Sequence, residues 1–367
     1  MIIGCPCLLV LLCAALMHHE SEEDEAVSVS TVFKEYQDFC HHGHLHFTDK
    51  VLFDGNFGGE CVQYYECFNP HDSKTHAYIK LKDKISSAAS KELKWLMKLK
   101  KAETNSHYFK FSHVLGFHFH RSSHCMIFQA VSCKLSDYLR NSELDLTRRH
   151  QLCEDVCSGL YFLHSFSPCI IHCALTPESV LVCAGGTARL CDLSRAHYLQ
   201  DGSRGRSVKE RIRKLISKFH LKKWEAITSQ NLHAERFTDV EKLYLSPEWK
   251  SMTVDDKHDV FSLGVVIMEV LTGNSPTPRG KFGQDEIRHR RSHDVKALRQ
   301  THPSAAEVVV GYCLRQHPSD RSPVDEVLQQ LQSARRESAV GVSASPPAES
   351  HPPAESHPPF SVSCCCY

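Results

Sequence analysis

The sequence lacks several features that would assign a protein to a common functional class at once. Lysine and arginine total 43, and aspartate and glutamate also total 43, so no net charge indicates nucleic acid or acidic partners. No N-x-S/T glycosylation site is present, which argues against secretion. The 18 cysteines include no C-x-x-C pair with a matching second pair, so the sequence does not favour a structural zinc site.

An apolar run of the roughly 20 residues that span a bilayer is also missing. The nearest approach is MIIGCPCLLVLLCAALM at residues 1–17. It predicts either a cleavable signal peptide or a short membrane anchor, with Cys5, Cys7 and Cys13 open to palmitoylation. We therefore expect membrane association or entry into the secretory pathway, with a buried N-terminus in a cytoplasmic protein as the alternative.

The flanking segments have compositions that cannot bury a core. Residues 18–45 include ESEEDEA and predict an acidic, solvated spacer. Residues 334–367 contain the repeat SPPAESHPPAESHPPF and predict a disordered tail rich in proline, serine and histidine. The tail ends in CCCY, a terminal cysteine cluster that either is palmitoylated or exposes plain thiols.

Residues 46–333 have the periodicity of one folded domain. The stretch KVLFDGNFGGECVQYYECFN alternates around glycines, which predicts a β-hairpin. SAASKELKWLMKLKKA and RRHQLCEDVCSGLYFLHSF place apolar residues at helical spacing, and DKHDVFSLGVVIMEVLTG is apolar nearly all round, as a buried helix is. Strands first and helices later predict an α+β fold with two unequal lobes.

Five motifs occur in order within this domain: FDGNFGGE, AYIK, HCALTPESVL, CDLSRA and LSPEWK. Their order and the elements between them resemble the eukaryotic protein-kinase family over most of the chain. The resemblance implies a bilobal kinase fold with a small strand-rich N-lobe and a larger helical C-lobe. The buried helix and CLRQHPSDRSP look closest to tyrosine-kinase-like groups.

The resemblance assigns nucleotide-binding positions in the N-lobe. Gly55, Phe57 and Gly58 match the second glycine, the aromatic tip and the third glycine of the loop that covers ATP phosphates. Lys80 matches the lysine that holds the α- and β-phosphates, and Glu92 is its expected partner on the next helix. A solvated lysine and a surface glutamate are the alternative.

The catalytic loop retains its framework but not its chemistry. The family writes H-R-D-L-K-P-x-N, so His172 is kept while Ala174 stands where an aspartate accepts the substrate proton. Thr176 replaces the lysine beside the phosphoryl group, and Ser179 replaces the asparagine that binds Mg²⁺. Because a positioned base contributes about 10²–10⁴-fold in rate, we expect severely impaired phosphotransfer.

Asp192 matches the metal-binding aspartate of D-F-G and is the candidate Mg²⁺ ligand. Leu193 and Ser194 take the places of phenylalanine and glycine, so the backbone freedom of that glycine is lost. Three outcomes remain open: ATP bound with Mg²⁺, nucleotide bound alone, or an empty pocket.

Three further residues match architectural positions of the family. Glu248 lies in the A-P-E-like segment, Asp259 at the start of the buried helix, and Arg321 near the end of the C-lobe. The resemblance implies a buried ion pair between Glu248 and Arg321, which ties the activation segment to the helical lobe.

The 55 residues between Asp192 and Glu248 include the basic stretch RGRSVKERIRKLISKFHLKKWEAI. Val208, Ile212, Leu215 and Phe219 share one face of a helix there, so residues 208–227 predict a basic amphipathic helix. Such a helix docks on an anionic membrane, in a groove of a protein partner, or on its own lobe. Nucleic acid is less favoured, because aromatic residues do not interleave the charges.

Together these features predict a pseudokinase that serves as a scaffold or allosteric regulator in signalling. The alternative is a weakly active, atypical kinase in which Glu178 replaces the missing base.

Overall fold

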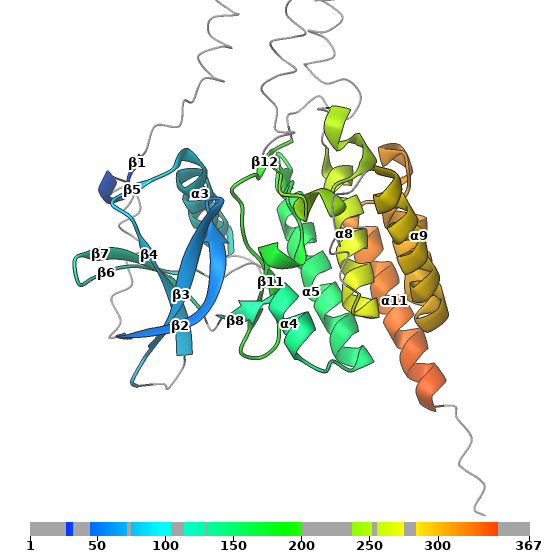
Figure 1. Cartoon of the computed structure of the whole chain (residues 1–367), viewed down its shortest axis with the longest axis horizontal. Coiled ribbons are helices and arrows are strands. Elements are labelled where there is room, and N and C mark those ends of the chain that lie inside the picture. The colour runs from blue at the N-terminus through cyan, green and yellow to red at the C-terminus, as the bar shows by residue number, and fades with distance from the viewer. Residues whose placement is uncertain are drawn as a thin grey trace, which may run out of the picture.

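The computed structural model describes residues 27–31, 45–71, 75–103, 114–129, 131–199, 237–251, 255–274 and 284–343. The N-terminal apolar segment, the repeat at residues 345–360 and the basic stretch 208–227 lie outside these residues. Residues 334–343, which were predicted to begin the disordered tail, instead form the end of helix α11 (Val324–Ser343), because Ala334 is buried at 3% exposure in the main core. The described chain forms two lobes, one built on a sheet and the other on helices (Figure 1).

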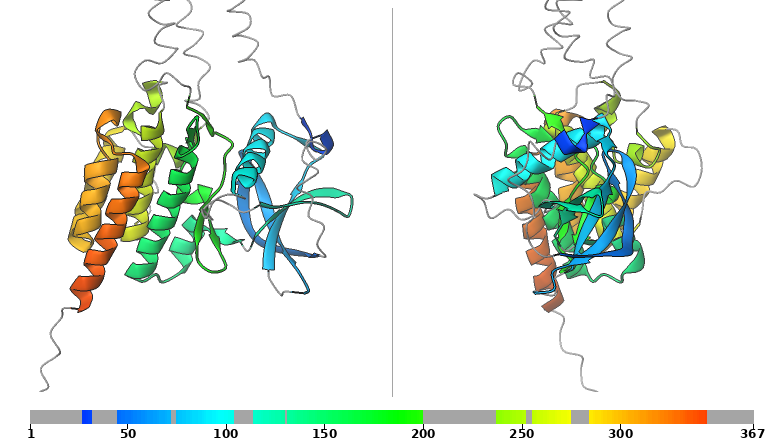
Figure 2. Two further views of the ribbon diagram at one scale, coloured as in Figure 1. Left: turned by 180° about the vertical axis from the view of Figure 1, so that it is seen from behind. Right: turned by 90° about the vertical axis from the view of Figure 1, so that its left-hand side faces the viewer.

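The N-lobe contains a five-stranded antiparallel sheet in the order β2-β3-β4-β7-β6. Helix α3 (Ser87–Glu103) lies on the side of this sheet that faces the C-lobe (Figures 1 and 2). The strands are β2 (His46–Phe57), β3 (Glu60–Phe68), β4 (Thr75–Leu81), β6 (Val114–His120) and β7 (Ser123–Phe128).

Both faces of this sheet are buried around strand β4. Ala77 and Ile79 belong to the main core, which includes Leu93 and Leu96 of α3. Tyr78 belongs to a second, smaller core on the opposite face of the sheet. Successive side chains of a strand point to opposite faces, so Lys80 shares the outer face with Tyr78.

Part of the predicted acidic spacer is folded, which corrects the expectation that residues 18–45 are solvated. Strand β1 (Val27–Ser28) pairs with β5 (Lys84–Ile85), directly before α3. Val29 follows β1, has no exposed surface and joins the main core, and its N–H donates to the carbonyl of Asp83 at 3.0 Å. Burying one valine stabilises the folded state by roughly 1.5–3 kcal/mol, which a solvated spacer cannot gain.

The C-lobe is helical, as the sequence predicts. Asp145 caps α5 by accepting the N–H of Arg148 at 2.7 Å, and Gly273 ends α8 in the left-handed conformation at φ 73°. No helix in the described part of the chain is long and apolar enough to cross a membrane. The helices are α4 (Leu135–Asn141), α5 (Leu146–His164), α8 (Asp256–Thr272), α9 (Gln284–Thr301), α10 (Pro303–Val308), the π-helical turn η5 (Val309–Cys313) and α11 (Val324–Ser343).

Short strands and 3₁₀ turns make up the rest of the described chain, and some of them carry the candidate site. The strands form one three-stranded sheet, β11-β10-β8, and one pair, β12-β9. Their bounds are β8 (Val131–Lys134), β9 (Ile170–Ile171), β10 (Val180–Cys183), β11 (Ala188–Leu190), β12 (His197–Tyr198), η2 (Pro177–Ser179), η3 (Glu241–Leu243), η4 (Pro247–Ser251) and η6 (Pro318–Asp320).

Candidate functional site

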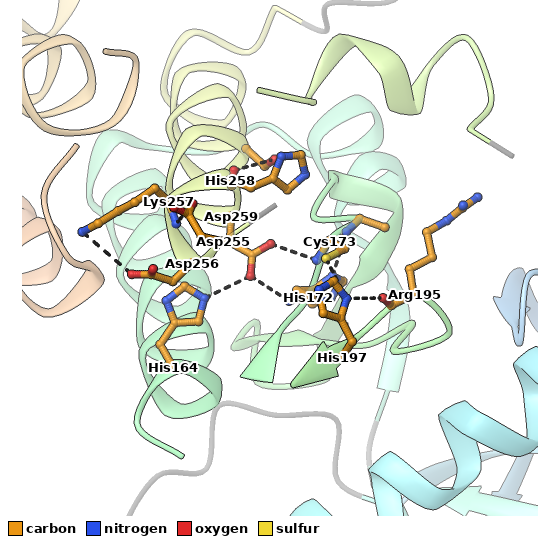
Figure 3. Close-up of polar contacts among 12 residues, drawn as sticks. His164, His172, Cys173, Arg195, His197, Asp255, Asp256, Lys257, His258 and Asp259 are labelled. Atoms are coloured by element: carbon orange, nitrogen blue, oxygen red, sulfur yellow. Dashed lines mark hydrogen bonds and ion pairs between the residues drawn. The ribbon is translucent and has the colours of Figure 1, made fainter. Parts of the chain in front are cut away.

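The loop between β9 and η2, which matches the family's catalytic loop, is anchored by Asp259 of α8. The Asp259 carboxylate accepts the backbone N–H groups of His172 and Cys173 at 2.7 and 2.8 Å (Figure 3). It also lies 3.0 Å from Nε2 of His164, at the end of α5. On its other side, Nε2 of His172 lies 2.9 Å from the carbonyl oxygen of Cys191. These contacts fix the loop in place.

Asp259 is fully buried, yet its pKa lies below the ordinary value. Burial alone would raise this pKa, but the hydrogen bond and charge of His164, with the charges of His172 and His258, lower it to about 2. The carboxylate is therefore ionised near neutral pH and able to hold the loop through two charge-assisted hydrogen bonds.

The positions that would perform chemistry on this loop serve its structure instead. Ala174 is 4% exposed and presents only a methyl group. Thr176 and Ser179 form a reciprocal capping box around η2: Thr176 accepts the N–H of Glu178, and Ser179 Oγ accepts the N–H of Thr176 at 2.9 Å. Ser179 Oγ also lies 3.1 Å from the carbonyl oxygen of Ala174, so its hydroxyl is used within the loop.

Lys80 does not reach Glu92, contrary to its predicted role as the phosphate-binding lysine. Its ammonium lies 3.5 Å from Asp49 and 4.4 Å from the centre of the Tyr65 ring, on the outer face of the sheet. The inward position next to it belongs to Ile79, which has no exposed surface. Successive side chains of a strand point to opposite faces of the sheet. The observed register of β4 differs by one residue from the predicted one, so Ile79 takes the inward position that was expected for Lys80.

Glu92 is buried with 2% exposure, and its Oε2 accepts the backbone N–H of Gly58 at 2.6 Å. Burial raises the pKa of this carboxyl well above 4.5 and the nearby charge of Asp192 raises it further, although backbone hydrogen bonds from Gly58, Leu193 and Asp192 oppose the shift. Among the described residues, no lysine or arginine pairs with Glu92. The predicted Lys80–Glu92 ion pair is therefore absent from the described structure.

The glycine-rich segment forms a tight hairpin between β2 and β3. Phe57 pairs with Glu60, and the two residues between them, Gly58 and Gly59, have φ values of 62° and 76°. Such a turn requires the left-handed conformation that glycine adopts without strain. Phe57 is 3% exposed and packs in the main core, so it is not the aromatic tip that the sequence predicted.

Asp192, the predicted metal ligand, has a positive φ of 57° and hydrogen-bonds within its own turn. Its Oδ1 accepts the hydroxyl of Ser194 at 2.6 Å, and the N–H of Ser194 lies 3.4 Å away. Ser194 occupies the position where the family has glycine, and its hydroxyl donates a hydrogen bond to the carboxylate of Asp192. Sequence reasoning did not anticipate this contact.

Glu178, the alternative base, is paired with a cation. Its Oε2 accepts from Nζ of Lys134 at 2.6 Å. Burial would raise the pKa of Glu178, but the hydrogen bond and charge of Lys134 outweigh that effect and hold it below its ordinary value. A carboxylate stabilised as the anion is a weaker base.

The structure brings Glu248 and Arg321 together. Two parallel hydrogen bonds of 2.5 and 2.8 Å join the guanidinium to the carboxylate. Arg321 is 2% exposed and also donates to the carbonyl oxygens of Lys257 and Arg315, both at 2.9 Å. Beside this pair, the buried hydroxyl of Ser246 lies 2.7 Å from Nδ1 of His258.

Taken together, these residues do not fit ATP with Mg²⁺ in the predicted way. The only matched lysine faces away from the glycine hairpin. The candidate metal ligand Asp192 accepts a hydrogen bond from Ser194, and Ser179, which replaces the metal-binding asparagine, bonds within the catalytic loop itself. Among the residues that the structure describes, the groups predicted to hold phosphates and a cation therefore do not converge on one point.

Sequence reasoning also missed two aromatic residues of this region. Trp95 of α3 donates its Nε1–H to the carbonyl of Ala196 at 3.2 Å, which ties α3 to the segment after Asp192. Tyr64 of β3 is 2% exposed and packs beneath the glycine hairpin. The sequence does place Tyr64 in a strand whose polar and apolar residues alternate. That pattern predicts that one face of the strand is buried, but it does not predict which residues Tyr64 contacts.

The chain is similar to several curated proteins of Arabidopsis thaliana. It is 26% identical over 213 residues to the LRR receptor-like serine/threonine-protein kinase RGI1. This alignment covers 54% of the present chain and 16% of RGI1. It is 24% identical over 244 residues to a probable leucine-rich repeat receptor-like protein kinase, and this alignment covers 61% of the present chain and 23% of the relative. A leucine-rich repeat receptor-like serine/threonine-protein kinase is 24% identical to it over 252 residues, and this alignment covers 62% of the present chain and 20% of the relative.

This chain thus matches less than a quarter of the length of these relatives. The family model for the protein kinase domain matches residues 54–331, which is more than half of the chain. That match agrees with the two lobes, with the anchored catalytic loop and with the Glu248–Arg321 pair. The chain belongs to the protein kinase family, whose members use ATP and Mg²⁺.

Proposed function

We propose that this kinase-fold protein does not transfer phosphate and acts in signalling as a scaffold or allosteric partner. The observation that carries the proposal is Ala174, a methyl group in an otherwise fully anchored catalytic loop. A loop that had merely decayed would have no reason to keep two backbone hydrogen bonds to Asp259.

The weak-kinase alternative requires Glu178 to act as the base. Its ion pair with Lys134 lowers its basicity and directs the carboxylate towards β8. The missing inward lysine also removes the cation that would neutralise a transferring phosphoryl group. Both features favour the pseudokinase.

A phosphotransfer assay on the full chain tests this proposal. It uses radiolabelled ATP with Mg²⁺ or Mn²⁺ and follows both autophosphorylation and a general acceptor protein. We expect wild type and Ala174→Asp to give the same background, because the lysine position is lost as well. Incorporation that Asp192→Asn abolishes would overturn the proposal, since a co-purifying kinase would not respond to that substitution.

Partner contact and localisation rest on segments outside the described residues. We infer that the basic amphipathic stretch 208–227 binds a protein partner and that residues 1–17 attach the protein to a membrane. The receptor-like names of the relatives support membrane association. Flotation of the full chain with phosphatidylcholine vesicles, with and without phosphatidylserine, separates the two segments. We expect flotation that is independent of anionic lipid, as binding by residues 1–17 predicts; flotation that requires phosphatidylserine would put 208–227 on the membrane and contradict its role in binding a protein.

A further inference from the structure

The backbone of the glycine hairpin rests directly on α3. A Cβ on Gly58 would overlap the backbone of Ala89, so the hairpin tip and the start of the helix are in close contact. The N–H of Gly58 then points at the carboxylate of Glu92, one helical turn further along α3, and binds it at 2.6 Å. In kinases the amides of this loop cradle phosphate oxygens. Here the carboxylate of Glu92 accepts the hydrogen bond of one of these amides, that of Gly58.

A second side chain fills the space beneath the hairpin. A Cβ on Gly55 would lie 2.5 Å from Cε2 of Tyr64, so the tyrosine ring covers that glycine closely. The Tyr64 ring stacks on Phe53 with centroids 4.5 Å apart and lies 5.3 Å from the ring of Phe128, the last residue of β7. Tyr64 and Phe128 are each 2% exposed. Three rings therefore form a continuous column from β2 to the strand that leads into the C-lobe.

Helix α3 is in turn joined to the segment that follows Asp192. Burial raises the pKa of Tyr64, and the nearby acidic groups of Cys191, Glu92 and Asp192 raise it further. Trp95 fixes α3 to that same segment through Ala196. The hairpin, α3 and the Asp192 segment are thus joined without any added ligand.

We propose that the nucleotide site is occupied by the chain itself, with Glu92 as the internal ligand of the Gly58 amide and Tyr64 as the filler beneath Gly55. The lobes close on these residues, and ATP enters only by breaking the Glu92 contact and displacing the ring. The inference rests on the proposed function, because a chain that transfers no phosphate can dispense with an open site. Its test has a separate readout.

Hydrogen exchange of the full chain, read by mass spectrometry on peptides covering residues 53–60, measures the hairpin directly. Wild type protects the Gly58 amide, and millimolar ATP with Mg²⁺ leaves that protection unchanged. Glu92→Gln keeps an accepting oxygen and keeps the protection. Glu92→Leu removes the acceptor and speeds exchange by roughly tenfold, as expected for losing one buried hydrogen bond to a carboxyl group. Lys80→Ala, the matched control on the outer face, changes nothing.

The outcomes are distinct. Added protection of residues 53–60 by ATP in wild type, or a Gly58 amide that exchanges freely, overturns the self-occupied site. If ATP adds protection but no phosphate is transferred, this inference fails while the proposed function stands. If phosphate is transferred as well, both fail. Should Glu92→Leu not fold, the wild-type and Glu92→Gln measurements still decide the question.

Discussion

Replacing Glu92 by glutamine is the substitution whose effect differs most between an ordinary kinase and this chain. In a kinase with the lysine in place, the glutamate is one half of an ion pair, and removing its charge leaves a buried cation unpaired. Here the carboxyl is 2% exposed, accepts the N–H of Gly58 and has no cation beside it among the described residues. Glutamine keeps the shape and the accepting oxygen but removes the charge.

The sign of the pH dependence follows from the pKa. Burial raises the pKa of Glu92 above 4.5, so the folded state binds the proton more tightly than the unfolded state. The stability that this group contributes is fully present below pH 4.5 and is lost as the pH rises through the folded-state pKa. Each pKa unit by which the two states differ corresponds to about 1.36 kcal/mol.

We therefore expect Glu92→Gln to unfold with the same free energy as wild type at pH 4.5 and to be the more stable protein at pH 7.5. The gain should be about 1–3 kcal/mol, the cost of burying an incompletely paired polar group. That range corresponds to a rise in the unfolding midpoint of roughly 2–5 °C for a domain of this size. Thermal and urea unfolding at the two pH values measure it. A loss of stability at pH 7.5 would refute the reasoning, because it would reveal a cation paired with Glu92.

The remaining predictions concern the framework. Arg321→Ala should lower the free energy of unfolding by about 3–5 kcal/mol, because it removes the buried guanidinium that makes two hydrogen bonds to the largely buried Glu248 carboxylate; urea unfolding measures it, and a loss under 1 kcal/mol would contradict the structure. The pKa of Asp259 is lowered to about 2, so the stability that this carboxylate contributes is present above pH 3.8 and is lost as the pH falls through 2. About 2 kcal/mol of the stability that wild type loses on acidification should therefore be missing in Asp259→Asn, as urea unfolding across this pH range measures. Equal acid sensitivity of the two proteins would count against the hydrogen bonds around Asp259. Val29→Ala should destabilise the N-lobe by about 2 kcal/mol, measured by thermal unfolding, whereas no effect would mean that residues 27–31 do not pack there.

The C-lobe could be predicted from the sequence because its helices are long and strongly patterned. Fourteen of the 17 residues of α8 are buried, and its apolar run could only be a core helix. The ion pair between Glu248 and Arg321 was implied by motif order alone, since the family fixes both positions along the chain.

Strand β4 shows why the site could not be predicted with the same accuracy. His76, Ala77, Tyr78 and Ile79 are all buried, because a core covers each face of the sheet there. A strand buried on both faces has no apolar–polar alternation, so its sequence does not say which residues face α3. The lysine was therefore assigned to the inner face when it lies on the outer one.

The contacts of Glu92, Asp192 and Val29 were beyond prediction for a different reason. Each depends on a partner distant in sequence or on a single replaced residue: Gly58 for Glu92, Ser194 for Asp192 and the β1–β5 pairing for Val29. Local patterns report burial and period, whereas these contacts arise only when the elements are packed together.

The most direct test of this account is a thermal-shift titration of the full chain with ATP, with and without Mg²⁺. A ligand at 100 times its dissociation constant stabilises the folded state by about 2.7 kcal/mol, which would raise the midpoint by several degrees. We expect no shift at millimolar ATP in either condition, because Tyr64 and Glu92 already occupy the site. A saturable shift that requires Mg²⁺ would contradict the account and show that the site opens to nucleotide.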